Sequence, residues 1–309
     1  MNFEQREHEE NNPYLQLLIL AGYAAAGALL SSLIGIVIVF SMYGSAILDP
    51  AALAGGDPKF IAGLKILQIC VFLGIFLGPP LLLAVTEKRK INVFYQFKRP
   101  QWNFLLAVFL IMVLSMPLME LIALVNQKMV LPEALKPLEE WMRRKEDEAM
   151  EMTYLFLTMK TVTDFLVNIF MIALLPGICE ELMFRGAIQR SLSRIFSNPH
   201  VAIWVAAFIF SFIHLQFYGF FPRLLLGAAF GYIYFWSGNL WYAMLAHFLN
   251  NAYAVCVAWY LQQKNIPLND ESVTMEFQWY GYVISLVLTA VLFIYFKNKS
   301  KAEYGEQLD

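Results

Sequence analysis

The sequence predicts an all-α fold: a polytopic membrane helix bundle with about eight transmembrane helices. First, 59% of the 309 residues are hydrophobic and only 15% are charged, with a mean hydropathy of +0.56. A soluble domain would carry roughly 25% charged residues. Second, several stretches reach the length of about 20 apolar residues that a helix needs to cross the hydrocarbon core. Composition and pattern therefore both indicate a membrane protein.

The expected spans divide the chain into five parts. These are a polar tail (1–14), N-terminal transmembrane helices (15–130), an amphipathic surface segment (131–160), core helices (161–261), and a last span with a basic tail (262–309). The spans themselves are expected at 15–43, 61–86, 103–126, 161–183, 200–216, 222–237, 239–261 and 277–297. Because short connectors join the last four, the C-terminal half is expected to be a compact bundle.

The distribution of Lys and Arg predicts the orientation. The loop "EKRKINVFYQFKRPQ", the arginines after the fourth span and the C-terminal "KNKSK" are basic, and short basic loops stay in the cytoplasm. We therefore expect both termini to be cytoplasmic, in the inner membrane if the source is bacterial. Segment 131–152 also carries basic residues although the span count places it outside, and its mixed charge is typical of an amphipathic surface helix.

Charge and cysteine content exclude several classes of protein. The net charge is only -2, and no basic block is interleaved with aromatic residues, so no nucleic-acid partner is expected. Cys70, Cys179 and Cys256 lie in apolar segments without CxxC spacing, which favours neither a disulfide framework nor a thiolate zinc site. The acidic N-terminus lacks the basic start of a signal peptide, so the first span is expected to stay in the membrane.

Ionisable groups inside apolar segments are the candidates for function, because each costs several kcal/mol unless it is paired or faces a cavity. In the core helices the ionisable and amide side chains of this kind are Asp164, Glu180, Glu181, Arg185, His214, Arg223, His247, Asn250 and Asn251. The other two histidines, His8 and His200, lie in the tail and at a loop end.

Helical spacing separates the two adjacent glutamates in "GICEELMFRG". Glu181 and Arg185 are four residues apart, which favours an ion pair on one face of a helix. Glu180 points about 100° away and has no such partner. An unmatched carboxylate in a poorly solvated place is suited to act as a general base. The alternative is that both glutamates lie at a wet helix end and have no chemical role.

The histidines admit two interpretations each. His214 follows Phe210 by four residues on an aromatic face, where a lone histidine more often holds helices together than acts as a catalyst. His247 and Asn251 are one turn apart, so they are suited to donate to one oxyanion, or alternatively to bond carbonyls of neighbouring helices. With the spans given above, His214 lies far from Glu180. Their meeting requires the fourth helix to extend further inward, the fifth to start later or tilt, or a kink at Pro176 and Gly177.

Three motifs in order resemble the CPBP family of intramembrane proteases, which includes type II CAAX prenyl endopeptidases and bacteriocin-processing or bacteriocin-immunity proteins. "EELMFR" fits EExxxR, "FSFIH" fits FxxxH and "HFLNN" fits HxxxN, over roughly residues 160–255. The HExxH and GxSxG motifs of common zinc and serine hydrolases are absent from the sequence.

The resemblance implies a hydrolase with membrane helices around a water-accessible cavity. It assigns Glu180 and His214 to water activation, His247 and Asn251 to the oxyanion, and Glu181 with Arg185 to a supporting ion pair. The expected partners are a membrane-associated peptide or protein substrate and the lipid bilayer. No cofactor is expected. The family has been labelled both metalloprotease and glutamic protease, and two Glu with two His are also compatible with zinc, although Asn is a poor zinc ligand.

Two other functions remain open at this stage. Intramembrane Glu and His also form proton relays in transporters, which predicts pH-dependent flux without proteolysis. A non-catalytic membrane partner, such as an immunity protein, uses its polar residues only to tie helices together, so Glu180→Gln would leave its function intact. The sequence does not identify the substrate or reveal whether the substrate is prenylated.

Overall fold

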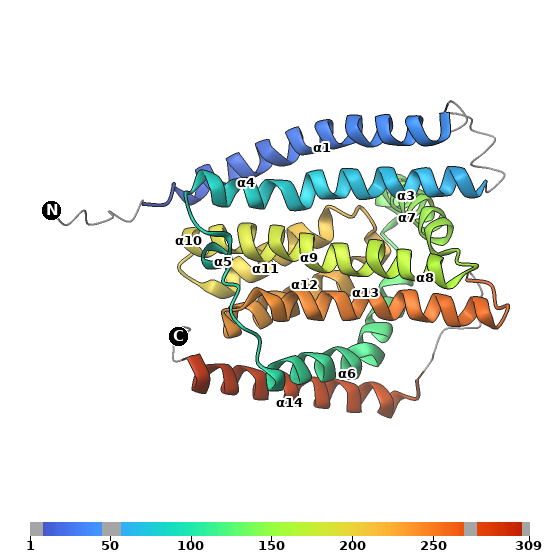
Figure 1. The fold of residues 1–309 in the computed structure, drawn as a ribbon. Coiled ribbons are helices and arrows are strands. Elements are labelled where there is room, and N and C mark those ends of the chain that lie inside the picture. The colour runs from blue at the N-terminus through green and yellow to red at the C-terminus, as the bar shows by residue number, and fades with distance from the viewer. Residues whose placement is uncertain (1–8, 45–56, 269–276, 305–309) are drawn as a thin grey trace.

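The computed structural model describes residues 9–44, 57–268 and 277–304, and these residues form helices and connecting turns without a strand (Figure 1). The α-helices are α1 (Pro13–Tyr43), α3 (Pro58–Phe72), α4 (Gly78–Thr86), α5 (Ile91–Phe94), α6 (Trp102–Gln127), α7 (Lys136–Leu157), α8 (Val162–Asn168), α9 (Leu175–Glu181), α10 (Arg190–Ile195), α11 (Pro199–Phe212), α12 (Phe220–Ser237), α13 (Leu240–Gln263) and α14 (Trp279–Tyr304). Wider π-helical turns form η2 (Leu73–Leu77), η4 (Ile169–Leu174) and η5 (Leu182–Gln189), and short 3-10 turns form η3 (Glu133–Leu135) and η6 (Phe217–Gly219).

Five helical segments among the described residues are long and apolar enough to cross a membrane. They are Pro13–Tyr43, Pro58–Thr86, Trp102–Gln127, Val162–Ile195 and Trp279–Glu303. The other three expected spans are helices too, but α11 has only 14 residues, about 21 Å of rise against a hydrocarbon core of roughly 30 Å. The all-helical fold is therefore confirmed, and the number of eight spans stays a prediction.

The fourth span is longer than the sequence pattern indicates. Its predicted end at residue 183 is wrong, because α8, η4, α9, η5 and α10 run together over 34 residues from Val162 to Ile195. The hydrophobic pattern stops where charges begin, but Glu181 and Arg185 pair inside the protein and allow the helix to continue. Glu180 and Glu181 consequently lie near the middle of this helix.

Two further boundaries differ from the prediction. The fifth helix ends at Phe212 rather than 216, and the chain turns back through Leu215, whose φ of 52° lies in the left-handed region. The last helix continues to Tyr304, so "KNKSK" is helical rather than part of a tail. Lysine is a good helix former whose stem can lie along apolar surface, which explains the extension.

The helices form a core flanked by two outer pairs (Figure 1). One pair is α1 with the α3–α4 helix, and the opposite pair is α6 with α14. The first pair approaches closely where two glycines meet, because a Cβ on Gly27 would clash with the carbonyl oxygen of Gly74. Small residues of this kind allow membrane helices to pack backbone against backbone.

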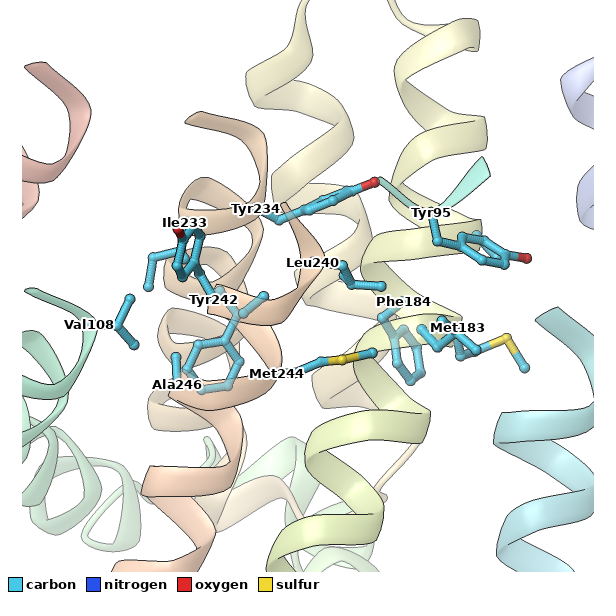
Figure 2. Close-up of a cluster of buried hydrophobic side chains, with 14 of the residues drawn as sticks. Tyr95, Val108, Met183, Phe184, Ile233, Tyr234, Leu240, Tyr242, Met244 and Ala246 are labelled. Atoms are coloured by element: carbon cyan, nitrogen blue, oxygen red, sulfur yellow. The ribbon is translucent and has the colours of Figure 1, made fainter. Parts of the chain in front are cut away.

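The main apolar core lies between α6, η5, α12 and α13 (Figure 2). Val108, Phe184, Ile233 and Tyr242 are among its buried members, and each comes from a different one of these helices. This packing fixes η5 and α13 relative to each other. It therefore places the charged residues of both helices at a defined separation.

A polar cluster marks the end of the bundle where α1 begins and α14 ends (Figure 1). Glu10 binds Arg190 at 2.6 Å and Arg194 at 3.2 Å, and lies 3.9 Å from Arg89. Burial, which disfavours the charge, is outweighed by the hydrogen bonds and charges of these arginines and by Gln16, so the pKa of Glu10 lies below its usual value. The basic loop, the arginines of α10 and the end of α14 thus share one end of the molecule.

Helix α7 lies away from that end, as an exposed surface helix (Figure 1). None of its 22 residues is fully buried, and its charges pair locally, as in Arg143 with Glu139 at 2.6 Å. The prediction of an amphipathic helix within 131–160 agrees with this structure. Asp164, which follows α7, caps α8 in a reciprocal capping box with Thr161 and has no place in the core site.

Candidate active site

Glu180 and Glu181 are adjacent on α9, and both are buried, with exposed fractions of 7% and 0%. Their side chains have different partners. An oxygen of Glu181, Oε1, lies 2.6 Å from Nη1 of Arg185, so the expected ion pair is present. Glu180 makes no ion pair with an arginine or lysine of the described residues. The helical spacing therefore separated the two carboxylates correctly.

Arg185 is held on several sides. Its Nη2 donates to the carbonyl of Gly227 at 2.8 Å, and its guanidinium lies 4.8 Å and 5.4 Å from the ring centroids of Phe210 and Phe230. Aromatic faces attract a desolvated cation. These contacts offset the cost of burying a side chain that is only 1% exposed.

His247 joins the glutamate pair to the rest of the site. Its Nδ1 lies 2.7 Å from Oε1 of Glu181, its Nε2 lies 3.8 Å from Oε2 of Glu180, and its ring stacks on Phe230 at 5.3 Å. The sequence assigned Glu181 to Arg185 alone. In the structure Glu181 also orients His247, so that the ring presents Nε2 to Glu180.

His214 lies just after the end of α11 and contributes to the same cavity as Glu180. Its Nδ1 lies 2.7 Å from the carbonyl oxygen of Phe210, and the two rings meet edge to face at 5.1 Å. Since a carbonyl only accepts, Nδ1 carries the proton and Nε2 keeps its lone pair. The extension of the fourth helix to Ile195 removes the separation expected between Glu180 and His214.

Asn251 is positioned by the backbone of the Glu-bearing helix. Pro176 has no N–H to offer the carbonyl of Ile172 four residues before it, and this carbonyl accepts a hydrogen bond from Nδ2 of Asn251 at 3.1 Å. Asn250 donates to Oδ1 of Asn251 at 3.1 Å and so fixes the amide orientation. One N–H of the Asn251 amide is left for another acceptor.

All four residues predicted to be catalytic line one cavity of about 510 Å³, a size typical of ligand sites. They are Glu180, His214, His247 and Asn251. Thr153 and Phe156 of α7 also contribute to the lining, as do Gln68 and Phe72 of the α3–η2 helix. The cavity thus faces the part of the bundle where α7 lies.

Sequence reasoning missed residues whose contribution depends on contact between helices. Phe230 stacks on His247, and the carbonyl of Gly227 accepts from Arg185. Gly177 allows α9 to approach α13, because a Cβ there would lie 3.1 Å from the backbone nitrogen of Phe248. The only signal in the sequence is a glycine or aromatic residue in an apolar run, which is common in any membrane helix.

The donor geometry gives no support to a zinc site. No group of three or more His, Cys, Asp or Glu side chains in the described part of the chain converges in a way that would hold a metal ion. Structural and catalytic zinc sites have at least three protein ligands. The older metalloprotease label therefore gains nothing from this arrangement.

The fold and the site define a class: an integral membrane helix bundle in which buried glutamate and histidine side chains line a largely apolar cavity. Residues 162–253 match the family described as "Type II CAAX prenyl endopeptidase Rce1-like". This segment contains EExxxR, FxxxH and HxxxN, so the resemblance to the CPBP family of intramembrane proteases is confirmed over residues 162–253.

The chain also matches a curated relative over a segment of similar length. The chain is 30% identical over 93 residues to "Uncharacterized protein YpbD" of Bacillus subtilis (strain 168), a segment that covers 29% of this chain and 44% of the relative. The chain therefore matches less than half the length of that protein. No solved structure matches the chain significantly.

Proposed function

We propose that the protein is an intramembrane endopeptidase that hydrolyses a peptide bond in a membrane-associated protein or peptide, with water activated by a glutamate. The observation that carries this proposal is the position of Glu180. Its carboxylate lines the cavity without an Arg or Lys partner in the described residues, together with His214, His247 and Asn251. The match of residues 162–253 to Rce1-like endopeptidases supports the same reaction.

Glu180 and His214 are assigned to water activation. A water bound between the Glu180 carboxylate and the Nε2 lone pair of His214 gives its proton to Glu180 as its oxygen attacks the carbonyl carbon of the substrate. The same carboxyl group then returns the proton to the amine that leaves when the C–N bond breaks. Because Nδ1 of His214 donates to the backbone carbonyl of Phe210, the lone pair on Nε2 is available to accept a hydrogen bond from the water.

His247 and Asn251 are assigned to the oxyanion. Protonated His247 donates from Nε2, and Asn251 donates from the amide N–H that Ile172 does not use. Donors placed where negative charge develops are worth about 10²-fold to 10³-fold in rate each. Glu181 and Arg185 act through His247, because Glu181 holds the ring by Nδ1 and Arg185 holds Glu181.

The position of the cavity indicates how the substrate reaches the site. The substrate enters from the bilayer or its surface, because the cavity lies within a membrane helix bundle. No nucleic-acid partner is proposed. We also propose that both termini are cytoplasmic, which the Lys and Arg residues of the loop after α4 and of the end of α14 favour.

The test compares purified wild type with Glu180→Gln in detergent-solubilised membrane fractions from cells that lack the protein. New peptide termini are read by mass spectrometry. Loss of the base is expected to reduce cleavage by about 10²-fold to 10⁴-fold, while the melting temperature is retained. The matched control is Glu120→Gln, which removes a carboxylate from α6 outside the cavity.

Three results would contradict the proposal. Termini that form equally with wild type and Glu180→Gln would remove Glu180 from the chemistry. Proton-coupled flux in liposomes without any cleavage would instead favour a transporter. If neither occurs and the Glu180→Gln protein still fulfils its role in cells, a non-catalytic membrane partner is the better description.

A further inference from the structure

Arg223 is a cation in the candidate active-site cavity that the proposed reaction does not use. It lies in the first turn of α12 and lines the cavity together with Glu180, His214 and His247. Leu226 and Phe230, one and two turns further along α12, line the same cavity. The residue is therefore on the same helix face as the ring that stacks on His247.

The guanidinium of Arg223 has neutral partners only. Nη2 donates to Oε1 of Gln216 at 2.9 Å, and Nη1 donates to the backbone carbonyl of Gln216 at 3.4 Å. No carboxylate in the described ranges lies within ion-pair distance of it. Since guanidinium offers five N–H donors, several remain for a ligand.

Three arginines of the core helix Val162–Ile195 differ from Arg223, because each of them pairs with a carboxylate. Arg185 pairs with Glu181, and Arg190 and Arg194 both pair with Glu10. Glu146 of α7 is the carboxylate whose charge acts most strongly on Arg223. It does not pair with Arg223, but accepts a hydrogen bond from the backbone N–H of Tyr218 at 3.1 Å. Burial raises the pKa of Glu146, and the hydrogen bond from Tyr218 and the charge of Arg223 oppose this shift.

An unpaired cation in a poorly solvated cavity is stabilised by an anionic ligand. A carboxylate fits best, because the guanidinium fork matches its two oxygens. A doubly charged phosphate is disfavoured by Glu180 and Glu146, whose charges both act on this position. A peptide substrate can supply a carboxylate either at its C-terminus or on an Asp or Glu side chain.

We propose that Arg223 binds a carboxylate of the substrate and so selects peptides in which an acidic group lies a few residues from the cleaved bond. This specificity role rests on the proposed peptidase function. Two helical turns separate Arg223 from Phe230, about 10 Å of rise, which an extended peptide spans in a few residues. Gln216 holds the guanidinium in the orientation that receives the carboxylate.

The test measures binding separately from cleavage. The probe is a library of hydrophobic nonapeptides with one randomised position, synthesised with either a free C-terminal carboxylate or a C-terminal amide. Peptides retained on immobilised Glu180→Gln protein are identified by mass spectrometry, and cleavage by the protein with an intact Glu180 is followed in parallel.

Both measurements, retention and cleavage, are repeated with Arg223→Gln, Arg223→Lys and Arg99→Gln. Arg99 is exposed and outside the cavity, so it controls for the loss of one charge.

The expected result is a preference of at least tenfold for peptides with a carboxylate. Arg223→Gln abolishes the preference, Arg223→Lys keeps part of it, and Arg99→Gln keeps all of it. Retention of free-acid over amide peptides identifies the C-terminus as the source, whereas enrichment of Asp or Glu in amide peptides identifies a side chain. Equal retention of peptides with and without a carboxylate by protein that keeps Arg223 overturns the proposal, as does an equal loss of retention for both kinds of peptide in Arg223→Gln. A carboxylate preference without cleavage by the intact protein would leave Arg223 as a ligand-binding residue and refute the peptidase function instead.

Discussion

The core helix Val162–Ile195 and the outer helices α1 and α14 are all long and apolar, yet they are held in place differently. About 39% of the most apolar window of the core helix is buried inside the protein, against 11% for α1 and 17% for the last helix. The core helix carries a buried ion pair and a hydrogen-bonded histidine contact, whereas α1 packs through Gly27 against Gly74. The middle of α1 therefore packs by shape, with its polar contacts at one end, while the core helix depends on charged partners near its middle.

The largest expected effect comes from breaking the charged pair of the core. Arg185→Leu leaves Glu181 buried beside His247, and stranding a buried charge costs about 3–5 kcal/mol. The double variant Glu181→Met/Arg185→Leu removes both charges and is expected to recover much of this stability. Cleavage should stay low in both, because Glu181 loses the arginine that holds it in Arg185→Leu, and His247 loses its orienting partner in the double variant. Unfolding in detergent and peptide cleavage measure the two effects.

This prediction separates stability from positioning. If the double variant is as unstable as Arg185→Leu, the stranded charge is not the cause of the loss. If the double variant regains activity together with stability, Glu181 does not position His247, and the contact between the two side chains has no catalytic consequence.

A smaller effect is expected at the periphery. Gly27→Ala places a Cβ against the carbonyl of Gly74, so α1 must move away from the α3–α4 helix, and overpacking of this kind costs about 1–3 kcal/mol. Gly22→Ala is the matched control, since nothing lies within 4 Å of its added Cβ. The melting temperature should fall only for Gly27→Ala, and cleavage per folded molecule should be unchanged in both. Loss of cleavage in a folded Gly27→Ala protein would show that the outer pair also positions the site.

The smallest effect is expected at the polar end of the bundle. Glu10→Gln removes the carboxylate shared by Arg190 and Arg194, and partly exposed ion pairs contribute less than about 1 kcal/mol. Because the pKa of Glu10 is lowered in the folded protein, its contribution is present at neutral pH and is lost as the pH falls through the lowered pKa. The difference in melting temperature between wild type and variant should therefore shrink in acid and at high salt. A difference that persists in strong acid would point to packing instead of charge.

Much of the site was predictable because its residues obey helical spacing. The separation of Glu180 from Glu181 and the Glu181–Arg185 pair follow from four-residue neighbours on one helix. The contact of Glu181 with His247 does not, because these residues are far apart in sequence and meet only when α9 packs on α13. The boundary at residue 183 failed for a related reason: hydropathy treats every charge as exposed, whereas Arg185 is buried among aromatic rings and a carbonyl.

Composition and periodicity are local properties, so the amino-acid sequence was enough to predict a helical membrane protein and to name the polar groups that cannot face lipid. Which of these groups meet depends on how the helices pack. Packing brings His214 and Glu180 to one cavity, pairs Asn251 with the backbone carbonyl of Ile172, and leaves Arg223 facing that cavity without a carboxylate among the described residues. The physical reason is that buried polar groups are satisfied by partners on other helices, and no pattern along one helix specifies those partners.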